Sequence, residues 1–531
     1  MLDPAALTDA PAGDVPVAAA PPTRPAGDTH AADHAVENPA DGSVAGHVHF
    51  ASTDEVDEVA RRLRAAQPAW QQLGPRGRGA VLGRFSRWLD DHRERLERLL
   101  VAETGKSAGD ASIEIPMVQG IITYYGGNAE AFLAPERRGS SSALTAAKKV
   151  TVEWHPRRLV GIIAPWNYPL ANALMDAVPA LTAGCAVLLK PSEVTPLVAE
   201  ELGRGWREIG APDVFAVVHG AGDVGGALID RVDMVQFTGS SRTGAAVAAQ
   251  AAGRLIPCSL ELGGKDPMIV LEDADLDRAA NGAVWGAMFN AGQTCVSVER
   301  VYVHASVYDG FVARVVAGVE ALRQGAGSGG DPDVGALADE RQLAIVERHV
   351  SEAVGAGARA LTGGRRRPGP GTFFEPTVLV DVDHSMSCMT DETFGPTLPI
   401  MRVADEDEAV RLANDSPYGL SATVWTGDAA RGRRIASQLE AGAVNVNDVI
   451  VNLLTMTAPH GGAKTSGIGH RFGGASGVQK YCRTTAVVEA RMTPKSEPLW
   501  YSSGPRTRRL AKRLMAATAR RGQRRLARRD R

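Results

Sequence analysis

One stretch of the chain reads Leu159-Val-Gly-Ile-Ile-Ala164-Pro-Trp-Asn167-Tyr-Pro169, a short apolar run that ends in turn-forming and polar residues. Three similar runs follow, at residues 186–189, 214–218 and 234–237. Residues 195–209, which lie between two of these runs, have the pattern of a helix. Short apolar strands that alternate with helices predict βαβ units and a parallel sheet covered on both faces. Ligands of such a sheet bind at the carboxyl ends of its strands, where Asn167 is expected to lie.

The chain is long enough for more than one such unit. At 531 residues it exceeds what a single hydrophobic core usually organises. A second region of alternating strands and helices runs from residue 267 to about 451, after a pair of glycines at 263 and 264. Residues 149–154 and 484–489 have the pattern of hairpin or edge strands outside both regions. We therefore expect an α/β fold with two parallel-sheet lobes and a small β element.

The N-terminal part has a different composition. Residues 1–45 are rich in Ala, Pro, Asp and Gly and contain few large apolar side chains, so we expect them to be disordered. Order is expected to begin near Thr53, a predicted helix N-cap that two acidic residues follow. A second amphipathic helix, which includes Leu82 and Leu99, is predicted to end near Gly105.

The composition argues against several classes of protein. With 44% hydrophobic and 22% charged residues, the chain has an ordinary globular balance. Its five cysteines are widely spaced and odd in number, which argues against a disulfide framework and indicates a reducing cytoplasm. The first 22 residues lack the pattern of a secretory signal, and no run approaches the roughly 18 apolar residues of a membrane span. A soluble, cytoplasmic protein is the prediction.

Charge is distributed unevenly along the chain. Residues 506–531 contain twelve Lys or Arg and one Asp, a local charge of +11, which leaves −14 for the rest of a chain whose net charge is −3. The acidic body argues against nucleic-acid binding. In the basic tail, Leu510, Leu514 and Ala517 share one helical face. The tail is either a solvated, disordered segment or an interfacial helix that makes peripheral contact with anionic lipid.

Cys295 ends the stretch Phe289-Asn-Ala-Gly-Gln-Thr-Cys295. A lone cysteine is most often a small, buried hydrophobic residue. Gly292 and the small neighbours allow the backbone to approach closely, however, so the thiol can face a cleft in which backbone N–H groups stabilise an oxyanion. Cys295 is therefore a candidate nucleophile.

Glu261 lies in Leu260-Glu261-Leu-Gly-Gly-Lys265, between two leucines and before two glycines. Burial of a carboxylate is unfavourable unless the group is paired or functional. One interpretation is a structural ion pair with Lys265. The other is a general base, because burial would raise the pKa of Glu261 into the range that suits proton abstraction.

Three more polar residues follow predicted strands. Asn167, between two prolines, is either a turn residue or the donor of an amide N–H to an oxyanion. Lys190 is either a surface lysine or part of the sheet edge at which a cofactor lies. Ser240 follows Gly239 at the start of a helix, where free N–H groups suit a pyrophosphate, although a simple helix cap explains this residue equally well.

Taken in order, these motifs resemble those of the NAD(P)-dependent aldehyde dehydrogenase superfamily, from about residue 45 to 490. The motifs that carry the resemblance are Pro165-Trp-Asn167, Lys190-Pro-Ser-Glu193, Phe237-Thr-Gly-Ser240, Glu261-Leu-Gly-Gly264, Gly292-Gln-Thr-Cys295, Glu392-Thr-Phe-Gly-Pro396 and Pro459-His-Gly-Gly462 with Ser466-Gly467. The 34-residue separation of Glu261 and Cys295 also matches the spacing in the family. Within it, the chain is most similar to the bacterial branch that resembles succinate-semialdehyde dehydrogenases.

The resemblance implies roles for particular residues. Cys295 is the implied nucleophile, Glu261 the implied general base and Asn167 an oxyanion donor, and Lys190 is grouped with these catalytic residues. No metal is required. The implied cofactor-binding residues are Trp166, Lys190, Glu193, Gly239, Ser240, Gly244, Leu262, Glu392 and Phe394.

The resemblance also implies a division into domains. Residues 46–137 and 159–262 would form a Rossmann-like NAD-binding domain, and residues 263–451 the catalytic domain. Residues 138–158 and 480–497 would form an oligomerisation element that joins subunits into a dimer or tetramer. Residues 506–531 are the basic tail.

Three residues refine the expected reaction. The carboxylate of Glu193 would repel a 2′-phosphate, which favours NAD over NADP. Phe289 and Met175 stand where members of the succinate-semialdehyde branch often carry arginine, so we expect an apolar aliphatic or aromatic aldehyde, with succinate semialdehyde as the alternative. Glu261 favours hydrolysis to the free acid over transfer to CoA. A non-enzymatic binding or structural protein that reuses the fold is a further alternative, but the thiol and the base are both present.

Overall fold

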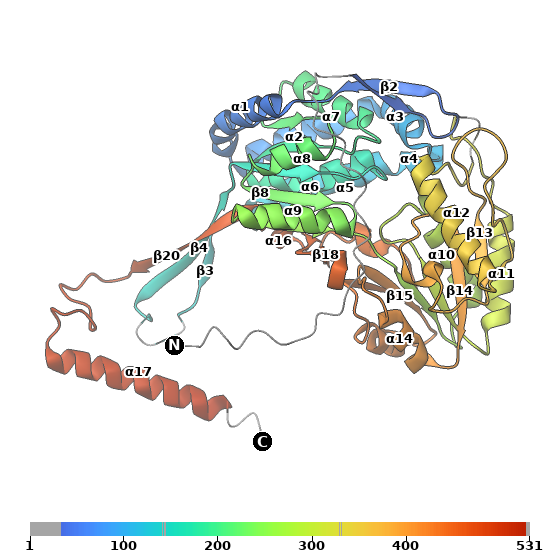
Figure 1. The fold of residues 1–531 in the computed structure, drawn as a ribbon. Helices are drawn as coiled ribbons and strands as arrows, with labels where there is room; N and C mark the ends of the chain where they lie inside the picture. Colours follow the sequence, from blue (N-terminus) through green and yellow to red (C-terminus); the bar gives the residue numbers. More distant parts are fainter. Residues whose placement is uncertain (1–32, 141, 143–144, 329, 331, 527–531) are drawn as a thin grey trace, which may run out of the picture.

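The computed structural model describes residues 33–140, 142, 145–328, 330 and 332–526 (Figure 1). Within these residues the chain forms two lobes built on parallel sheets and a narrow antiparallel sheet that extends away from them. The predicted α/β class with two parallel-sheet lobes is therefore confirmed. The disorder predicted for residues 1–32 lies outside the described residues.

The first lobe contains a six-stranded sheet in the order β18-β9-β8-β5-β6-β7. Its strands are β5 (Leu159–Ile163), β6 (Ala186–Lys190), β7 (Phe215–Val217), β8 (Met234–Thr238), β9 (Cys258–Glu261) and β18 (Gly467–Ile468). All are parallel except β18, which runs antiparallel to β9. The four strands predicted from the apolar runs are confirmed, with ends that differ by one residue.

Helices cover both faces of this sheet. The covering helices are α6 (Pro169–Ala183) and α7 (Leu197–Glu208), backed by α2 (Gly74–Asp91) and α5 (Glu114–Phe132), and on the other face α8 (Gly222–Ile229), α9 (Ser241–Gly253) and α1 (Thr53–Gln72). Helices α6 and α7 follow β5 and β6 on one side of the sheet order, and α8 and α9 precede β8 and β9 on the other side of β5, as expected for a right-handed connection of parallel strands. Helix α6 is buried along its whole length, so its mainly apolar sequence is explained by its position.

Order begins earlier in the chain than predicted. Strands β1 (Asp33–Glu37) and β2 (Val44–His49) form an antiparallel hairpin inside the segment 1–45 that was expected to be disordered. Val36 and Val48 of the hairpin pack with Leu197 of α7. A small apolar cluster supplied by a distant helix therefore orders a segment whose own composition is poor in large apolar residues.

Two helix boundaries also differ from the prediction. Ser52, rather than Thr53, caps α1, and it forms a capping box with Glu55. The second predicted helix is divided into α2 and α3 (Arg93–Thr104). His92 separates them, because its φ of −109° and ψ of 12° are not helical.

The second lobe contains a seven-stranded sheet in the order β12-β13-β14-β11-β10-β15-β16. Its strands are β10 (Pro267–Val270), β11 (Arg300–His304), β12 (Arg359–Ala360), β13 (Thr377–Val380), β14 (Thr397–Val403), β15 (Ser421–Trp425) and β16 (Ala443–Val446). All are parallel except β12. Its helices are α10 (Leu276–Met288), α11 (Tyr308–Glu320), α12 (Glu340–Gly355), α14 (Glu406–Asn414) and α15 (Ala429–Ala436).

After the second lobe, the chain returns to the first. Strands β17 (Pro459–His460) and β19 (Arg471–Phe472) pair with each other, and β18 between them joins the edge of the first sheet beside Glu261. The chain then enters β20 (Cys482–Ala490), which pairs along its whole length with β4 (Lys148–Pro156). Together with β3 (Glu136–Arg138) they form the narrow third sheet, which confirms the predicted hairpin or edge strands.

The described part of the chain ends in a long helix. Helix α17 spans Pro505–Leu526, so the interpretation of the basic tail as a disordered segment is wrong for these residues. Among the described residues, no helix has both the length and the apolar composition needed to cross a membrane.

Candidate active site

Asn167 lies just beyond β5, at the carboxyl edge of the first sheet. Its side-chain nitrogen Nδ2 donates a hydrogen bond to the Gln293 carbonyl at 3.0 Å, two residues before Cys295. Its own carbonyl accepts from Asn290 Nδ2 at 3.1 Å. The strand end is therefore tied to the Cys295 loop. A primary amide has two hydrogens, so Asn167 can also donate to an oxyanion at Cys295.

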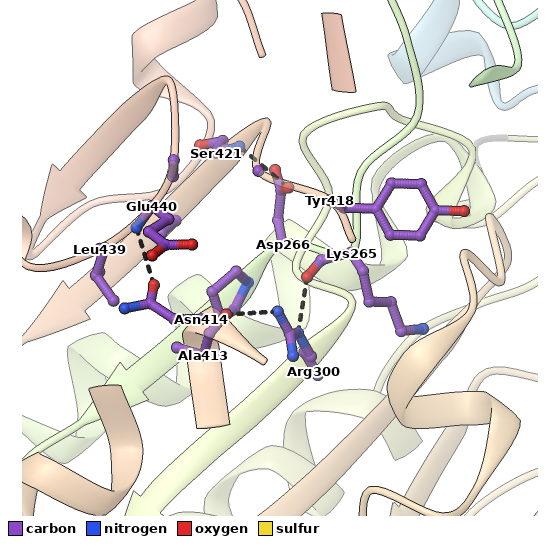
Figure 2. A pocket seen from close by; sticks show the side chains of 13 residues that line it. Lys265, Asp266, Arg300, Ala413, Asn414, Tyr418, Ser421, Leu439 and Glu440 are labelled. Carbon is purple, nitrogen blue, oxygen red and sulfur yellow. Dashed lines mark hydrogen bonds between the residues drawn. The ribbon is translucent and has the colours of Figure 1, made fainter. Parts of the chain in front are cut away.

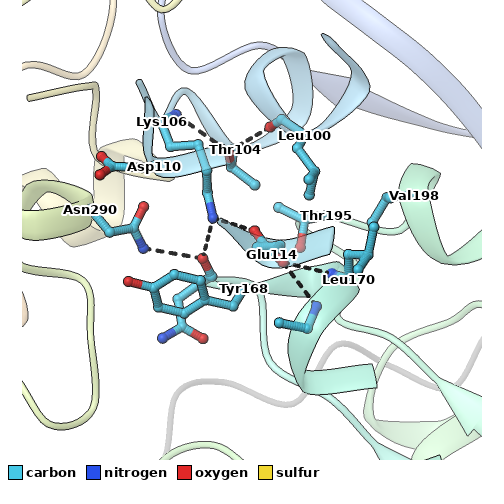
Figure 3. Close-up of polar contacts among 12 residues, drawn as sticks. Leu100, Thr104, Lys106, Asp110, Glu114, Tyr168, Leu170, Thr195, Val198 and Asn290 are labelled. Carbon is cyan, nitrogen blue, oxygen red and sulfur yellow. Dashed lines mark hydrogen bonds and ion pairs between the residues drawn. The ribbon is translucent and has the colours of Figure 1, made fainter. Parts of the chain in front are cut away.

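A buried ion pair, Lys106 with Glu114 (Figure 3), is hydrogen-bonded to the backbone of Asn167. Lys106 Nζ lies 2.5 Å from Glu114 Oε1 and donates to the Asn167 carbonyl at 2.9 Å. The other Glu114 oxygen accepts the N–H groups of Leu170 and Ala171 at the start of α6. Both charged side chains are at most 1% exposed. The pair fixes the first turn of α6 and the Asn167 peptide together, and the sequence analysis did not identify it.

The Cys295 loop has an unusual backbone. Asn290, Ala291 and Gly292 have consecutive φ angles of 54°, 55° and 73°, a left-handed turn directly after α10. A Cβ at Gly292 would lie 2.0 Å from the Gly395 carbonyl oxygen, so only glycine fits there. This confirms the predicted close approach of the backbone. Among residues 290–300, Cys295 alone is not fully buried, as a thiol that meets a substrate requires.

The thiol of Cys295 is protonated in its resting environment. Burial raises the pKa of Cys295 to about 12, against the opposing effect of the Arg471 charge. Burial also raises the pKa values of Cys388 to about 11 and of Cys482 to about 12. Thiol acidity therefore does not distinguish Cys295 from the other cysteines. Cys258 and Cys295 are both partly exposed, so the position of Cys295 beside Asn167 is what distinguishes it.

Glu261 ends β9 and lies opposite Gly467 of β18. It is 3% exposed, and neither carboxylate oxygen has a hydrogen-bond partner among the described residues. Burial raises the pKa of Glu261 to about 7, although Arg471 and Lys480 lower it. His460 Nε2 lies 3.9 Å away, but burial lowers the pKa of His460 to about 3, so this ring is neutral and forms no ion pair. Glu261 is thus a buried acid that is poised to exchange a proton near neutral pH.

The structure excludes the alternative in which Glu261 pairs with Lys265. Lys265 Nζ instead lies 2.7 Å from Glu299 Oε2. Glu299 also accepts the backbone N–H groups of Thr393 and Phe394 at 3.2 and 2.8 Å. The Lys265–Glu299 pair therefore holds the loop after α13 (Ser387–Thr390), which carries Glu392 and Phe394.

Arg471 is a buried charge that the sequence analysis did not identify. Its guanidinium binds Asp176 through Nε at 3.1 Å and through Nη2 at 2.7 Å, and Nη2 also donates to Thr238 Oγ1 at 2.7 Å. Its charge acts on both Glu261 and Cys295. Arg471 and Asp176 lie 295 residues apart, so no local pattern pairs them.

Lys190 and Glu193 lie at the end of β6, as predicted. The ammonium of Lys190 is buried, donates to the Pro191 carbonyl at 2.9 Å and lies 3.5 Å from the half-exposed Glu193 carboxylate. The alternative of a surface lysine is therefore wrong. His34 of β1 reaches the Glu193 carbonyl at 3.1 Å, so the N-terminal hairpin borders this end of the site.

Ser240 caps α9 through its hydroxyl, which accepts from the Thr243 N–H at 3.3 Å. Ser240 itself is exposed, so the first turn of α9 is open to an anion as well as capped. A Cβ at Gly244 would lie 2.5 Å from Leu262 Cδ2, and one at Gly239 would lie 2.6 Å from the Phe237 ring. Gly244 therefore allows α9 to approach Leu262, directly after β9, and Gly239 leaves room for the Phe237 ring of β8.

Glu392 and Phe394 of the second lobe contact residues that follow strands of the first lobe. Glu392 Oε1 accepts the Gly264 N–H at 3.0 Å, and burial raises the pKa of Glu392 to about 7. The rings of Phe394 and Trp166 meet edge to face, with centroids 5.4 Å apart. The structure thus brings the two lobes together where a cofactor that spans them is expected.

A comparison with protein families agrees with this arrangement. Residues 27–487 match the model of the "Aldehyde dehydrogenase family". The chain belongs to the aldehyde dehydrogenase family. It oxidises aldehydes and uses a nicotinamide cofactor in doing so.

Relatives of this aldehyde dehydrogenase differ in their named substrates. A Mycolicibacterium smegmatis protein named "Putative succinate-semialdehyde dehydrogenase", with NADP(+) as its coenzyme, is 41% identical over 85% of this chain and 87% of its own. The "4,4'-diapolycopene aldehyde oxidase" of a Methylomonas species is 38% identical over 88% of each chain. A crystal structure of a Mycobacterium tuberculosis aldehyde dehydrogenase complexed with NAD+ superposes with a TM-score of 0.81, at 36% identity over 88% of this chain and 95% of that one.

A small pocket of this aldehyde dehydrogenase lies in the second lobe (Figure 2). Its lining includes Asp266, Arg300 and Ser421 but neither Cys295 nor Glu261. Asp266 accepts the Ser421 N–H at 3.1 Å, and Arg300 donates to the Lys265 carbonyl at 2.8 Å. These bonds fix the strands that follow the Gly263-Gly264 pair, so the pocket is part of the scaffold of the site.

Proposed function

We propose that this aldehyde dehydrogenase converts an apolar aliphatic or aromatic aldehyde into the free carboxylic acid, with NAD as the hydride acceptor. The observation that carries this proposal is the Glu261 carboxylate, which is buried and has no hydrogen-bond partner in the part of the chain that the structure describes. A buried carboxyl group needs a hydrogen-bond partner, and a water molecule can supply it. The same water is the reagent that hydrolysis to a free acid requires.

The chemistry uses three side chains in turn. As the Cys295 thiol releases its proton to water, its sulfur attacks the aldehyde carbon, and the Asn167 amide with the Cys295 N–H stabilises the oxygen that becomes negative. When bound, NAD accepts the hydride that leaves this carbon, which converts the adduct on Cys295 into a thioester. Glu261 then takes a proton from water, whose oxygen attacks the thioester carbonyl. The C–S bond breaks and the departing sulfur takes the proton that Glu261 accepted, which releases the acid and restores the thiol.

Residues at the edge of the first sheet suit NAD. The carboxylate of Glu193 can accept hydrogen bonds from both hydroxyls of the adenine ribose, and the open first turn of α9 at Ser240 suits the pyrophosphate. A 2′-phosphate would meet the negative charge of Glu193. Lys190 offsets only part of this repulsion, because its ammonium is already 3.5 Å from that carboxylate. The NADP(+) in the name of the mycobacterial relative makes this preference a point to test.

Steady-state kinetics with both cofactors tests the preference. We expect kcat/KM to be higher with NAD than with NADP, and Glu193→Gln to raise the value for NADP by removing the repulsive charge. Glu489→Gln, which neutralises an exposed carboxylate on β20, is the control. Equal values for the two cofactors in the wild type would contradict the proposal.

The substrate proposal depends on the side chains around Cys295. Tyr168, Phe289 and Trp285 form a series of rings with centroids 6.0 and 5.1 Å apart, and the Tyr168 hydroxyl lies 2.7 Å from Thr294 Oγ1, next to Cys295. Trp285 is 45% exposed, so the series begins at the surface. The nearby cation Arg471 is already bound by Asp176 and cannot anchor a substrate carboxylate without losing this partner.

A panel of aldehydes distinguishes the candidates. We expect hexanal and benzaldehyde to give higher kcat/KM values than succinate semialdehyde, and Cys295→Ala to abolish NADH formation. A preference for succinate semialdehyde would support the activity named for the mycobacterial relative instead. Absence of NADH with every aldehyde would support the alternative of a binding protein.

All five cysteines are unpaired, which supports the reducing cytoplasm as the place of action.

A further inference from the structure

Helix α17 lies outside the part of the chain that matches the family, which ends at residue 487. Figure 1 shows α17 away from both lobes, beyond the outer end of the β3–β4–β20 sheet. It contains nine Lys or Arg residues and no Asp or Glu. The proposed reaction uses none of its residues, so the helix requires a separate explanation.

One face of α17 is apolar and exposed. Leu510 and Leu514 on this face are 60% and 49% exposed, and Met515, which lies about 100° around the helix from Leu514, is 47% exposed. Leu510 and Leu514 are four residues apart, so they lie on the same face one turn from each other. Thr518, one turn further, donates its hydroxyl to the Leu514 carbonyl at 2.9 Å, so this hydroxyl does not break the apolar character of the face. In the part of the chain that the structure describes, these side chains have no apolar cover.

The opposite face of α17 is basic. The cations of its first four turns are Arg506, Arg508, Arg509, Lys512, Arg513 and Arg520. At 100° per residue, Arg508, Arg509 and Lys512 lie on the side of the helix away from Leu510 and Leu514. Arg513 and Arg520 lie toward the border of the leucine row, and Arg506, four residues before Leu510, continues that row. None of the six forms an ion pair with another described residue. Their charges are therefore available to an external anionic partner.

The segment directly before α17 in the chain exposes further apolar and aromatic side chains. Leu499, Trp500 and Tyr501 are 48%, 57% and 97% exposed. Trp and Tyr prefer the boundary between water and lipid, because they present an apolar ring and a polar group together.

We infer that α17 binds the surface of an anionic membrane, with its apolar face at the boundary of headgroups and acyl chains. A helix that is apolar on one face and rich in Lys and Arg on the other is typical of such binding. Lipid headgroups supply the negative charge and acyl chains cover the leucines, whereas a nucleic acid complements only the basic face. This inference rests on the proposed function, because apolar aldehydes concentrate in the membrane at which α17 would hold the enzyme.

Vesicle co-sedimentation of the full-length enzyme tests the inference. We expect binding to vesicles of phosphatidylcholine with phosphatidylglycerol, weak binding to phosphatidylcholine alone, and a loss of binding as salt is raised. Leu510→Ser/Leu514→Ser should weaken binding by removing the apolar anchor. Arg509→Gln/Arg513→Gln should weaken it about tenfold or more, since each basic residue contributes substantially at an anionic surface. The matched controls are Val354→Ser, an exposed apolar residue on α12, and Arg61→Gln/Arg98→Gln, two exposed arginines of α1 and α3.

The other outcomes overturn the inference. Equal binding of wild type and both α17 variants would do so, as would binding to a DNA duplex in preference to anionic vesicles. A fall in molar mass by light scattering on deletion of residues 505–531, without vesicle binding by the wild type, would assign the helix to contact between subunits. The kcat/KM for hexanal in solution keeps the two proposals apart. This kcat/KM should stay unchanged in the α17 variants. A wild-type enzyme that does not oxidise hexanal would refute the proposed function and not the membrane contact.

Discussion

At the scale of single residues, the charge of Glu261 should set the pH dependence of the reaction. Its pKa is about 7, and only the ionised form can accept a proton from water. Raising the pH through 7 therefore activates the base, and lowering it inactivates the base. We expect kcat to fall as the pH drops below about 7, which steady-state rates on either side of that pH will measure.

Replacement of this base separates the two halves of the reaction. In Glu261→Gln we expect a burst of NADH in rapid mixing, because Cys295 still attacks the aldehyde, and deacylation slower by about 100-fold or more. The decline of kcat at low pH should disappear with the carboxyl group. Steady-state activity equal to that of the wild type would refute the role of Glu261.

Arg471 offers a second prediction at this scale, as a positioning residue that acts through Glu261. Arg471 lowers the pKa of Glu261, and Asp176 opposes this effect less strongly. In Arg471→Met/Asp176→Asn, the decline of kcat should therefore move to higher pH. The double substitution avoids leaving one buried charge without its partner. Arg471→Lys keeps the charge and should keep the profile near that of the wild type; an identical profile in all three proteins would show that Arg471 is only structural.

The sequence identified those residues of the site that belong to short motifs. Asn167, Lys190, Glu193 and Ser240 each follow a recognisable strand, and parallel strands bring their carboxyl ends to one edge. Arg471 was not identified because its partner, Asp176, lies 295 residues away in the sequence. The sequence alone left two interpretations of Glu261. Lys265 is only four residues away in the chain, but in the fold its ammonium bonds to Glu299 instead.

At the scale of elements, the Lys106–Glu114 pair should couple stability to catalysis. In Lys106→Met the Glu114 carboxylate stays buried without its cation, which costs about 3–5 kcal/mol of stability in comparable cases. The Asn167 peptide also loses a hydrogen bond, so kcat should fall together with the melting temperature. Lys106→Met/Glu114→Gln removes the unpaired charge and should recover part of the melting temperature. A double variant that melts below the single one would contradict this account.

Strands and helices of the lobes were predictable where they are buried, because burial imposes an apolar pattern on a strand. The β1–β2 hairpin was missed for the opposite reason, since its only strong contacts are two valines against a helix from elsewhere. The break between α2 and α3 at His92 has no Pro or Gly to signal it. Helix α17 was one of two stated alternatives, because its charges suit a solvated segment as well as an interfacial helix.

At the scale of the whole molecule, the β3–β4–β20 sheet should join subunits. Strand β20 (Cys482–Ala490) is an edge of this sheet: one side of its nine-residue backbone pairs with β4, and no described strand lies along the other side. Val488 on this edge is 58% exposed, and a long exposed edge is a ready site for pairing with another chain. Lysine on an edge strand opposes such pairing, because its charge must then be buried or repelled. We therefore expect Val488→Lys to shift the enzyme to a smaller species in size-exclusion chromatography with light scattering. Val354→Lys on α12 should leave the molar mass unchanged, and a Val488→Lys enzyme with the wild-type mass would place the subunit contact elsewhere.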